Sequence, residues 1–138
     1  MRALEDLVSA GMVDYIGVSN FSVEDMEEAQ SALRNNPIVS NQILYNLRRR
    51  SAERDVIPFC RRNNITVIAY SPLAEGALAG GRSRRLPNAL GLGRAQSVLN
   101  DVADDVGKTT AQVALNWVAD QPGMVAIPKI EQPGANRG

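Results

Sequence analysis

The residues best suited to chemistry in this sequence are polar side chains that stand at the ends of short apolar stretches. Ser19 and Asn20 directly follow one such stretch. Gln42 lies within the next, and Tyr70 ends a third. Hydroxyl and carboxamide groups both donate and accept hydrogen bonds. They could bind a polar ligand, or Asn20 and Gln42 could satisfy backbone groups of their own loops. A tyrosine in this setting could equally be a core residue.

The residue types exclude several other chemistries. The chain of 138 residues has no histidine, which excludes histidine acid–base catalysis and histidine metal ligands from it. Cys60 is the only cysteine, so no internal disulfide can form. It has no base nearby in sequence, which favours a helix core position over a reactive thiol. Asp101, Asp104 and Asp105 have no other ligand type beside them, so we predict no metal site.

The composition is that of an ordinary globular domain with a single core. Hydrophobic residues make up 44% and charged residues 22%, and 15 basic residues balance 15 acidic ones. This balance gives no field that favours nucleic acid or an anionic membrane. The arginine runs at 48–50 and 82–85 are interpreted as solvated loops, since they lack interleaved aromatic residues. Without a signal peptide or a long apolar run, the expected location is cytoplasmic.

The hydrophobic pattern predicts short strands alternating with helices. Ser22 and Asp25 have the spacing of a capping box, Ser51 is the expected cap of a later helix, and Thr109 or Thr110 that of the last. The β-branched run at 65–70 is typical of a strand buried on both faces. Alternation of this kind predicts parallel β/α units with right-handed crossovers. The predicted strands are 15–18, 38–45, 65–70 and 124–127, and the predicted helices are 4–10, 22–34, 51–62, 96–106 and 109–120.

Two segments are predicted to lie outside this regular pattern, although all of residues 1–138 are expected to form one domain. Residues 74–94 are rich in Gly and Arg and have no sustained periodicity. Loops of this length in compact domains are usually functional or disordered. Residues 130–138 are polar and are expected to form a frayed tail.

Four motifs, taken in order, resemble the second half of the aldo-keto reductases. They are Gly17-Val18-Ser19-Asn20-Phe21, Ser40-Asn41-Gln42, Ala69-Tyr70-Ser71-Pro72-Leu73 with Gly76, and Ile127-Pro128-Lys129. The resemblance implies an α/β fold, in which the four strands are the fifth to eighth of an eight-stranded β/α (TIM) barrel. A complete barrel needs about 250 residues, so this chain would form half of one. In such barrels the site lies at the carboxyl ends of the strands.

The resemblance also assigns roles in binding a nicotinamide cofactor. Ser19, Asn20 and Gln42 match residues that hydrogen-bond the nicotinamide carboxamide, and Tyr70 matches the residue that stacks on the nicotinamide ring. The loop that passes over the pyrophosphate is matched by Ser71, Leu73 and Gly76.

Lys129 matches the family lysine near the adenosine 2′-phosphate, which favours NADP over NAD. The sequence departs from the family pattern beyond this lysine. Ile130 stands where the family usually has a small hydroxyl residue, and Ala135 stands where it usually has an arginine. NADP therefore remains the expected cofactor on weaker grounds.

The family's catalytic tetrad has no counterpart among these residues. It consists of an aspartate, a tyrosine, a lysine and a histidine on the first four strands. Tyr15, Tyr45 and Tyr70 belong to other matched segments, so no catalytic residue is assigned.

The expected function is therefore that of an aldo-keto reductase family protein, related to NADP-dependent oxidoreductases that reduce aldehydes and ketones to alcohols, and inactive alone. The alternatives are a non-catalytic interaction module that assembles through open sheet edges, and one subunit of a split reductase. A homodimer and a complementary N-terminal half are the expected partners.

Overall fold

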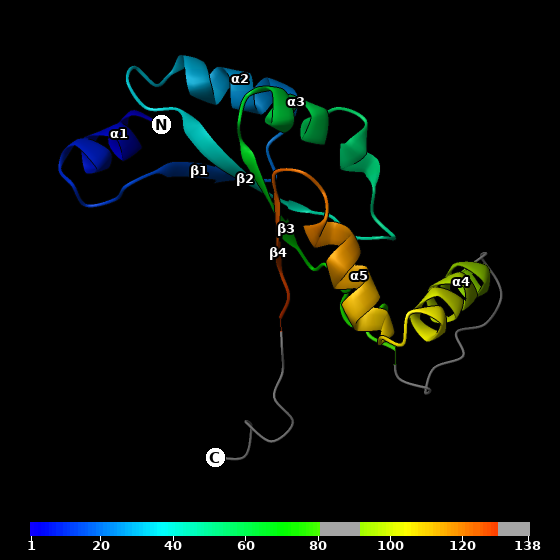
Figure 1. The fold of residues 1–138 in the computed structure, drawn as a ribbon. Coiled ribbons are helices and arrows are strands. Elements are labelled where there is room, and N and C mark those ends of the chain that lie inside the picture. Colours follow the sequence, from blue (N-terminus) through cyan, green and yellow to red (C-terminus); the bar gives the residue numbers. More distant parts are fainter. Residues whose placement is uncertain (81–91, 130–138) are drawn as a thin grey trace.

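The computed structural model describes residues 1–80 and 92–129, and within them four parallel strands form one sheet in the order β1-β2-β3-β4 (Figure 1). Helical segments separate consecutive strands, as the sequence predicts for β/α units. The result is half of a (β/α)8 barrel. The strands are β1 (Ile16–Ser19), β2 (Ile38–Leu44), β3 (Thr66–Tyr70) and β4 (Met124–Ile127), and the helices are α1 (Arg2–Ser9), α2 (Val23–Ser31), the 3-10 helix η1 (Ser51–Glu53), α3 (Val56–Arg62), α4 (Leu92–Asp105) and α5 (Thr110–Ala119).

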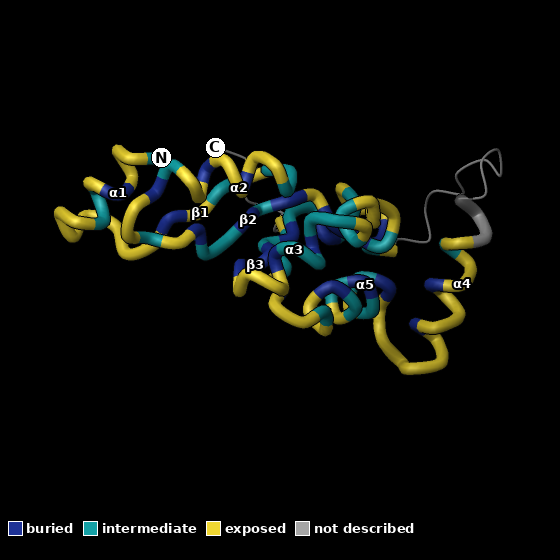
Figure 2. Tube along the Cα trace, turned by 90° about the horizontal axis from the view of Figure 1, so that it is seen from above, coloured by how far each residue is buried: buried dark blue, intermediate teal, exposed yellow. Residues whose placement is uncertain are grey.

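Helices α2, α3 and α5 cover one face of the sheet, which we call the covered face. Each of these helices contributes a buried residue to one hydrophobic cluster: Met26 from α2, Cys60 from α3 and Val118 from α5. Val67 and Ala69 of β3 complete the contact from the sheet side. Helices α1 and α4 lie at opposite ends of the molecule and are mostly exposed (Figure 2). The main core therefore lies between the sheet and its central helices.

The helix caps confirm two sequence predictions and correct a third. Ser22 forms a capping box with Asp25, and Thr109 caps α5. Ser51, however, begins only the short η1, and the side chain of Asp55 caps α3. Pro58 explains the break, because a proline inside a helix begun at residue 51 would clash with the preceding turn, whereas the first turn of a helix begun at residue 56 accepts it.

Strand β3 differs from its prediction. Val67 and Ala69 are buried, but Ile68 and Tyr70 are only half-buried and Thr66 is exposed. The helices among the described residues pack on one face, so the alternate side chains of each strand lie on a face that we call the uncovered face. The prediction of a strand buried on both faces was wrong for this reason.

Part of the predicted long loop lies within the described residues. Residues 71–79 form a series of turns in which buried Leu78 packs with Leu99 and Ala114. Helix α4 begins at Leu92, inside the predicted loop and before the helix start expected at residue 96. The rest of the loop, 81–91, and the expected frayed tail, 130–138, lie outside the described residues.

Across the described parts of the chain, no helix has both the length and the apolar character that crossing a bilayer demands.

Candidate cofactor site

Three of the sequence-predicted site residues meet where β1 and β2 end. Ser19 and Gln42 are partners in the parallel ladder. The hydroxyl of Ser19 donates to the backbone oxygen of Gln42 at 3.1 Å, and the backbone N–H of Asn20 donates to the same oxygen at 2.8 Å. The carboxamide of Asn20 contacts the Ser19 hydroxyl at 3.4 Å. These bonds hold Ser19 and Asn20 beside the backbone of Gln42.

Tyr70 lies on the neighbouring strand and on the same face as Gln42. Gln42 pairs with Ile68, and Tyr70 is two residues further along β3. Because side chains alternate along a strand, Gln42, Ile68 and Tyr70 all belong to the uncovered face. Tyr70 is half-buried on that face.

The turn after Tyr70 has an unusual backbone. Ser71, Ala74 and Glu75 have φ angles of 49°, 49° and 55°, and Gly76 follows at 87°. Only glycine adopts this left-handed region at low cost. Leu73 is half-buried against Leu78, Leu99 and Ala114, so its side chain anchors the turn to the helices. Gly76 is exposed.

Lys129 stands beyond the end of β4, the strand that pairs with β3. It is exposed and follows Ile127, which is the ladder partner of Tyr70. All eight sequence-predicted site residues therefore lie near the carboxyl ends of the strands or in the turn that follows β3. Ile130 and Ala135, where the sequence departs from the family pattern, lie outside the described residues.

Two buried asparagines at this edge were given no role from the sequence. The carboxamide of Asn41 bonds the backbone of Phe21, and that of Asn46 bonds the backbone oxygen of Ser71. Their signal was present but weak. Asn41 is a polar residue inside an otherwise buried strand, and Asn46 directly follows a run of apolar residues.

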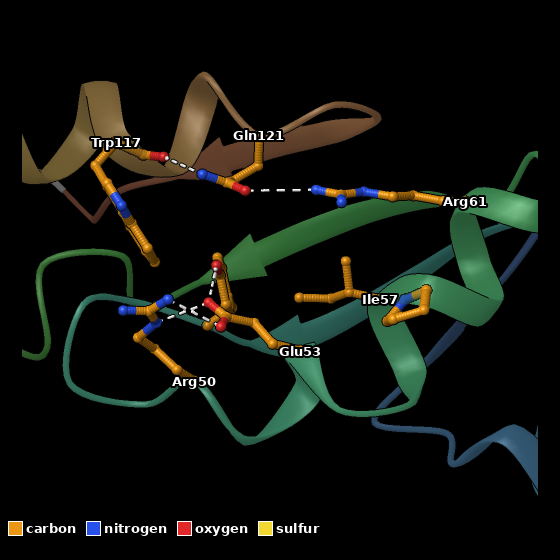
Figure 3. Close-up of a pocket in the computed structure, with 8 residues that line it drawn as sticks. Arg50, Glu53, Ile57, Arg61, Trp117 and Gln121 are labelled. Carbon is orange, nitrogen blue, oxygen red and sulfur yellow. Dashed lines mark hydrogen bonds and ion pairs between the residues drawn. The ribbon is translucent and has the colours of Figure 1, made fainter.

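A hollow of about 250 Å³ lies between β2, α3 and α5, and its polar groups are already paired (Figure 3). Tyr45 donates its hydroxyl to Glu53 at 2.7 Å, and Arg50 forms an ion pair with the same carboxylate at 2.7 Å. The ring of Trp117 stacks on that of Tyr45, with ring centroids 5.3 Å apart. The guanidinium of Arg50 lies over the Trp117 ring, 5.1 Å from the centroid of that ring. The cluster joins the β2–α3 connection to α5 and acts as a structural unit.

The titration behaviour of this cluster argues against a catalytic role. Burial, followed by the hydrogen bond to Glu53, raises the pKa of Tyr45, whereas a tyrosine acting as general acid near neutral pH needs a lowered pKa. The hydrogen bond from Arg50, followed by that from Tyr45, lowers the pKa of Glu53. Cys60 is fully buried and burial raises the pKa of its thiol, which confirms the core interpretation.

The four strands and the helices on one face of their sheet define a parallel β/α half-barrel, with polar residues at its carboxyl edge. The family model described as Aldo/keto reductase family matches residues 1–135. The chain belongs to the aldo-keto reductase family.

Known relatives and solved structures extend well beyond the matched region. The chain is 38% identical to an uncharacterized oxidoreductase of Mycobacterium tuberculosis, covering 93% of this chain and 44% of the relative. It is 37% identical to the methylglyoxal reductase of Escherichia coli, covering 94% of this chain and 42% of that protein. The chain thus spans less than half the length of these relatives.

Among solved structures, a thermostable aldo-keto reductase in complex with the inhibitor epalrestat matches with a TM-score of 0.79 and 36% identity, covering 95% of this chain and 43% of that one. An aldo/keto reductase from Klebsiella pneumoniae in complex with NADP and acetate matches with a TM-score of 0.72 and 36% identity, covering 94% and 42%.

Proposed function

We propose that this chain provides the nicotinamide half of an NADP(H) site in an aldo-keto reductase that reduces aldehydes or ketones to alcohols. The observation that carries the proposal is the cluster of Ser19, Asn20 and Gln42, which hydrogen bonds assemble at the carboxyl ends of β1 and β2. The likeness to a Klebsiella pneumoniae structure that contains NADP supports the choice of cofactor.

The donor set at this edge fits the chemistry of such a cofactor. The carboxamides of Asn20 and Gln42 offer both donors and acceptors to a nicotinamide carboxamide. Tyr70 presents its ring on the uncovered face, where it would stack on the nicotinamide. Ser71 and Gly76 would approach the pyrophosphate with hydroxyl and backbone groups. Lys129 would meet a 2′-phosphate as a point charge.

The reaction needs groups that these residues do not supply. When bound, the cofactor supplies the hydride, and the carbonyl oxygen must then receive a proton. The sequence has no histidine, and Tyr45 is buried with its hydroxyl bonded to Glu53. We therefore assign binding and orientation of the cofactor to this chain. Proton transfer is assigned to a separate segment that carries the family's catalytic tetrad.

The uncovered face and the sheet edges are the proposed place for that segment. Strands β1 and β4 form the two edges, and neither contains a charged residue or a proline that would block pairing. A complementary N-terminal half is the favoured partner, because the relatives extend beyond the matched region. A second copy of the chain, or a non-catalytic role in assembly, is the alternative. We place the protein in the cytoplasm, since Cys60 is a free, buried thiol.

Cofactor binding is tested by titrating the 138-residue chain with NADPH and following calorimetric heat or protein fluorescence. We expect weak binding, with a Kd roughly in the high micromolar to millimolar range, about −4 to −6 kcal/mol. Asn20→Ala combined with Gln42→Ala should weaken it further. Asn63→Ala is the matched control, since Asn63 uses its carboxamide to bond the backbone of α3. A submicromolar complex would contradict the expected weak binding, and equal binding by the double variant would contradict the assigned residues.

Catalysis is tested with an aromatic aldehyde and NADPH in two samples. One contains this chain alone, and the other contains it together with the N-terminal half of the Escherichia coli methylglyoxal reductase. We expect no turnover by the chain alone and measurable turnover in the mixture. Turnover by the chain alone on the order of 1 per second or more would overturn the proposal.

A further inference from the structure

Two left-handed residues occupy key positions in the candidate cofactor site. Asn20 has a φ of 58° and Ser71 a φ of 49°. Each directly follows the last residue of a strand, β1 or β3. Asparagine enters this region more readily than most residues, whereas serine does so chiefly when its surroundings hold it there. In both cases a buried asparagine forms a hydrogen bond with the backbone at or beside the left-handed residue.

Asn41 holds the backbone that follows Asn20. It lies on β2 with its side chain 0% exposed. Its Nδ2 donates to the backbone oxygen of Phe21 at 3.0 Å, and its Oδ1 accepts from the N–H of Phe21 at 3.4 Å. On the other side, the N–H of Asn20 donates to Gln42 at 2.8 Å. Asn20 is therefore fixed from both directions while its own side chain stays exposed.

Asn46 plays the corresponding part for Ser71. It is 1% exposed, and its Nδ2 donates to the backbone oxygen of Ser71 at 2.9 Å. Its Oδ1 accepts from the N–H groups of Arg48 and Arg49, each at 3.0 Å. The same carboxamide thus closes its own turn and reaches the turn after β3.

We infer that Asn41 and Asn46 are positioning residues of the cofactor site, with Asn41 setting the conformation of Asn20 and Asn46 that of Ser71. This inference rests on the proposed function. Each position needs a short side chain with one donor and one acceptor, which asparagine provides. Aspartate would place a carboxylate against a carbonyl oxygen, and an apolar residue would leave buried backbone groups unpaired. Loops formed in advance reduce the entropy cost of binding.

The conformational part is tested by NMR on the 138-residue chain. Left-handed residues have a short distance between the amide proton and the α-proton of the same residue. Asn41→Ala should abolish this signature at Asn20 and leave Ser71 unchanged. Asn46→Asp should abolish it at Ser71, yet keep the amides of Arg48 and Arg49 protected from exchange, because the acceptor remains. Asn41→Ser and Asn46→Ala serve if either first variant does not fold.

The binding part uses NADPH titrations of the same variants. Each should raise the Kd about 3- to 10-fold, because the site loop loses one hydrogen bond in Asn46→Asp and two in Asn41→Ala. Two controls should stay within about twofold. Asn63→Ala removes an exposed carboxamide bond, and Ile57→Val weakens the main core without removing a hydrogen bond of either loop.

Two results would overturn the inference. One is retention of both left-handed signatures in folded variants, and the other is a Kd that follows global stability, as in Ile57→Val. Failure of the unmodified chain to bind NADPH would instead overturn the proposed function, and the NMR measurements would still decide whether the two asparagines set the loops.

Discussion

The two faces of the sheet carry similar residues in different surroundings. Val67 on the covered face is 2% exposed, whereas Val125 on the uncovered face is 49% exposed. Ile127 and Leu44, also on the uncovered face, are 41% and 37% exposed. Chemically these are all core residues. What distinguishes the two faces is the presence of helices α2, α3 and α5 over only one of them.

The comparison teaches that an apolar strand does not by itself establish how many of its faces are buried. Each face needs its own packing layer, and only one layer is formed by the described residues. Apolar surface left in water favours association, at about 25 cal/mol per Å² buried. The uncovered face is therefore the part of the molecule that a partner would stabilise most.

The largest expected effect comes from truncating equivalent valines on the two faces. Val67→Ala should lower the free energy of unfolding by about 2–3 kcal/mol, because it leaves a cavity in the covered core. Val125→Ala should change it by less than about 0.5 kcal/mol in dilute protein. Urea unfolding of both variants measures the difference. Equal losses would mean that the uncovered face is buried in solution.

A charge on the uncovered face should weaken association. Val125→Lys would place an ammonium group where a complementary half or a second copy must pack, so we expect at least tenfold weaker assembly. Light scattering over a concentration series measures this. Val98→Lys, on an exposed site of α4, is the control and should leave assembly unchanged. A stable monomer of the unmodified chain at micromolar concentration would rule out self-association.

Acid should weaken the attachment of α1 to the segment that follows α2. Glu5 accepts backbone N–H bonds from Arg34, Asn35 and Asn36, at 2.8, 2.6 and 3.0 Å, and these bonds, that of Asn35 foremost, lower its pKa. Its ionised form therefore contributes stability above its ordinary pKa of 4.5, and this contribution is lost as pH falls through the lower folded value.

Glu5→Gln makes this pH dependence measurable. It should reduce stability most at neutral pH, and the difference from the unmodified chain should shrink below about pH 4.5. Urea unfolding across this pH range follows both proteins. Parallel stability curves would contradict the role of the ionised carboxylate.

The smallest expected change in stability concerns the turn that follows β3. Glu75 is exposed and left-handed, so Glu75→Gly should raise the free energy of unfolding by about 0.5–1 kcal/mol. Ala77→Gly is the control, because Ala77 has no positive φ and should lose a similar amount. Thermal unfolding of both variants checks the signs. A loss in Glu75→Gly would show that its left-handed backbone carries no strain.

Local signals predicted the elements well where the cause is local. Ser22 and Asp25 bond each other across one helical turn, so their spacing alone specifies the cap. The strand at Met124–Ile127 follows a proline–glycine turn and was predicted with its observed bounds. The break before α3 was missed, although Pro58 was the available signal.

The candidate site was predicted by resemblance rather than by local signals. Gln42 lies more than twenty residues from Ser19 and Asn20 in the sequence, and only the pairing of β1 with β2 brings it beside them. Asn41 and Glu5 were missed because they bond backbone groups that are distant in sequence, and the bond from Asn46 to Ser71 was missed for the same reason. Such bonds depend on folded geometry and give only a weak signal in the sequence.

The sequence by itself therefore determined the family, the order of strands and helices, and which residues reach the carboxyl edge. The order of strands and helices follows from hydrophobic periodicity, whereas the family and the site residues follow from the resemblance of four motifs. The tertiary structure alone decided which face of the sheet the helices cover and which buried carboxamides hold the site loops. Both depend on packing between segments that are distant in sequence, and the free energy of that packing exists only once the segments meet.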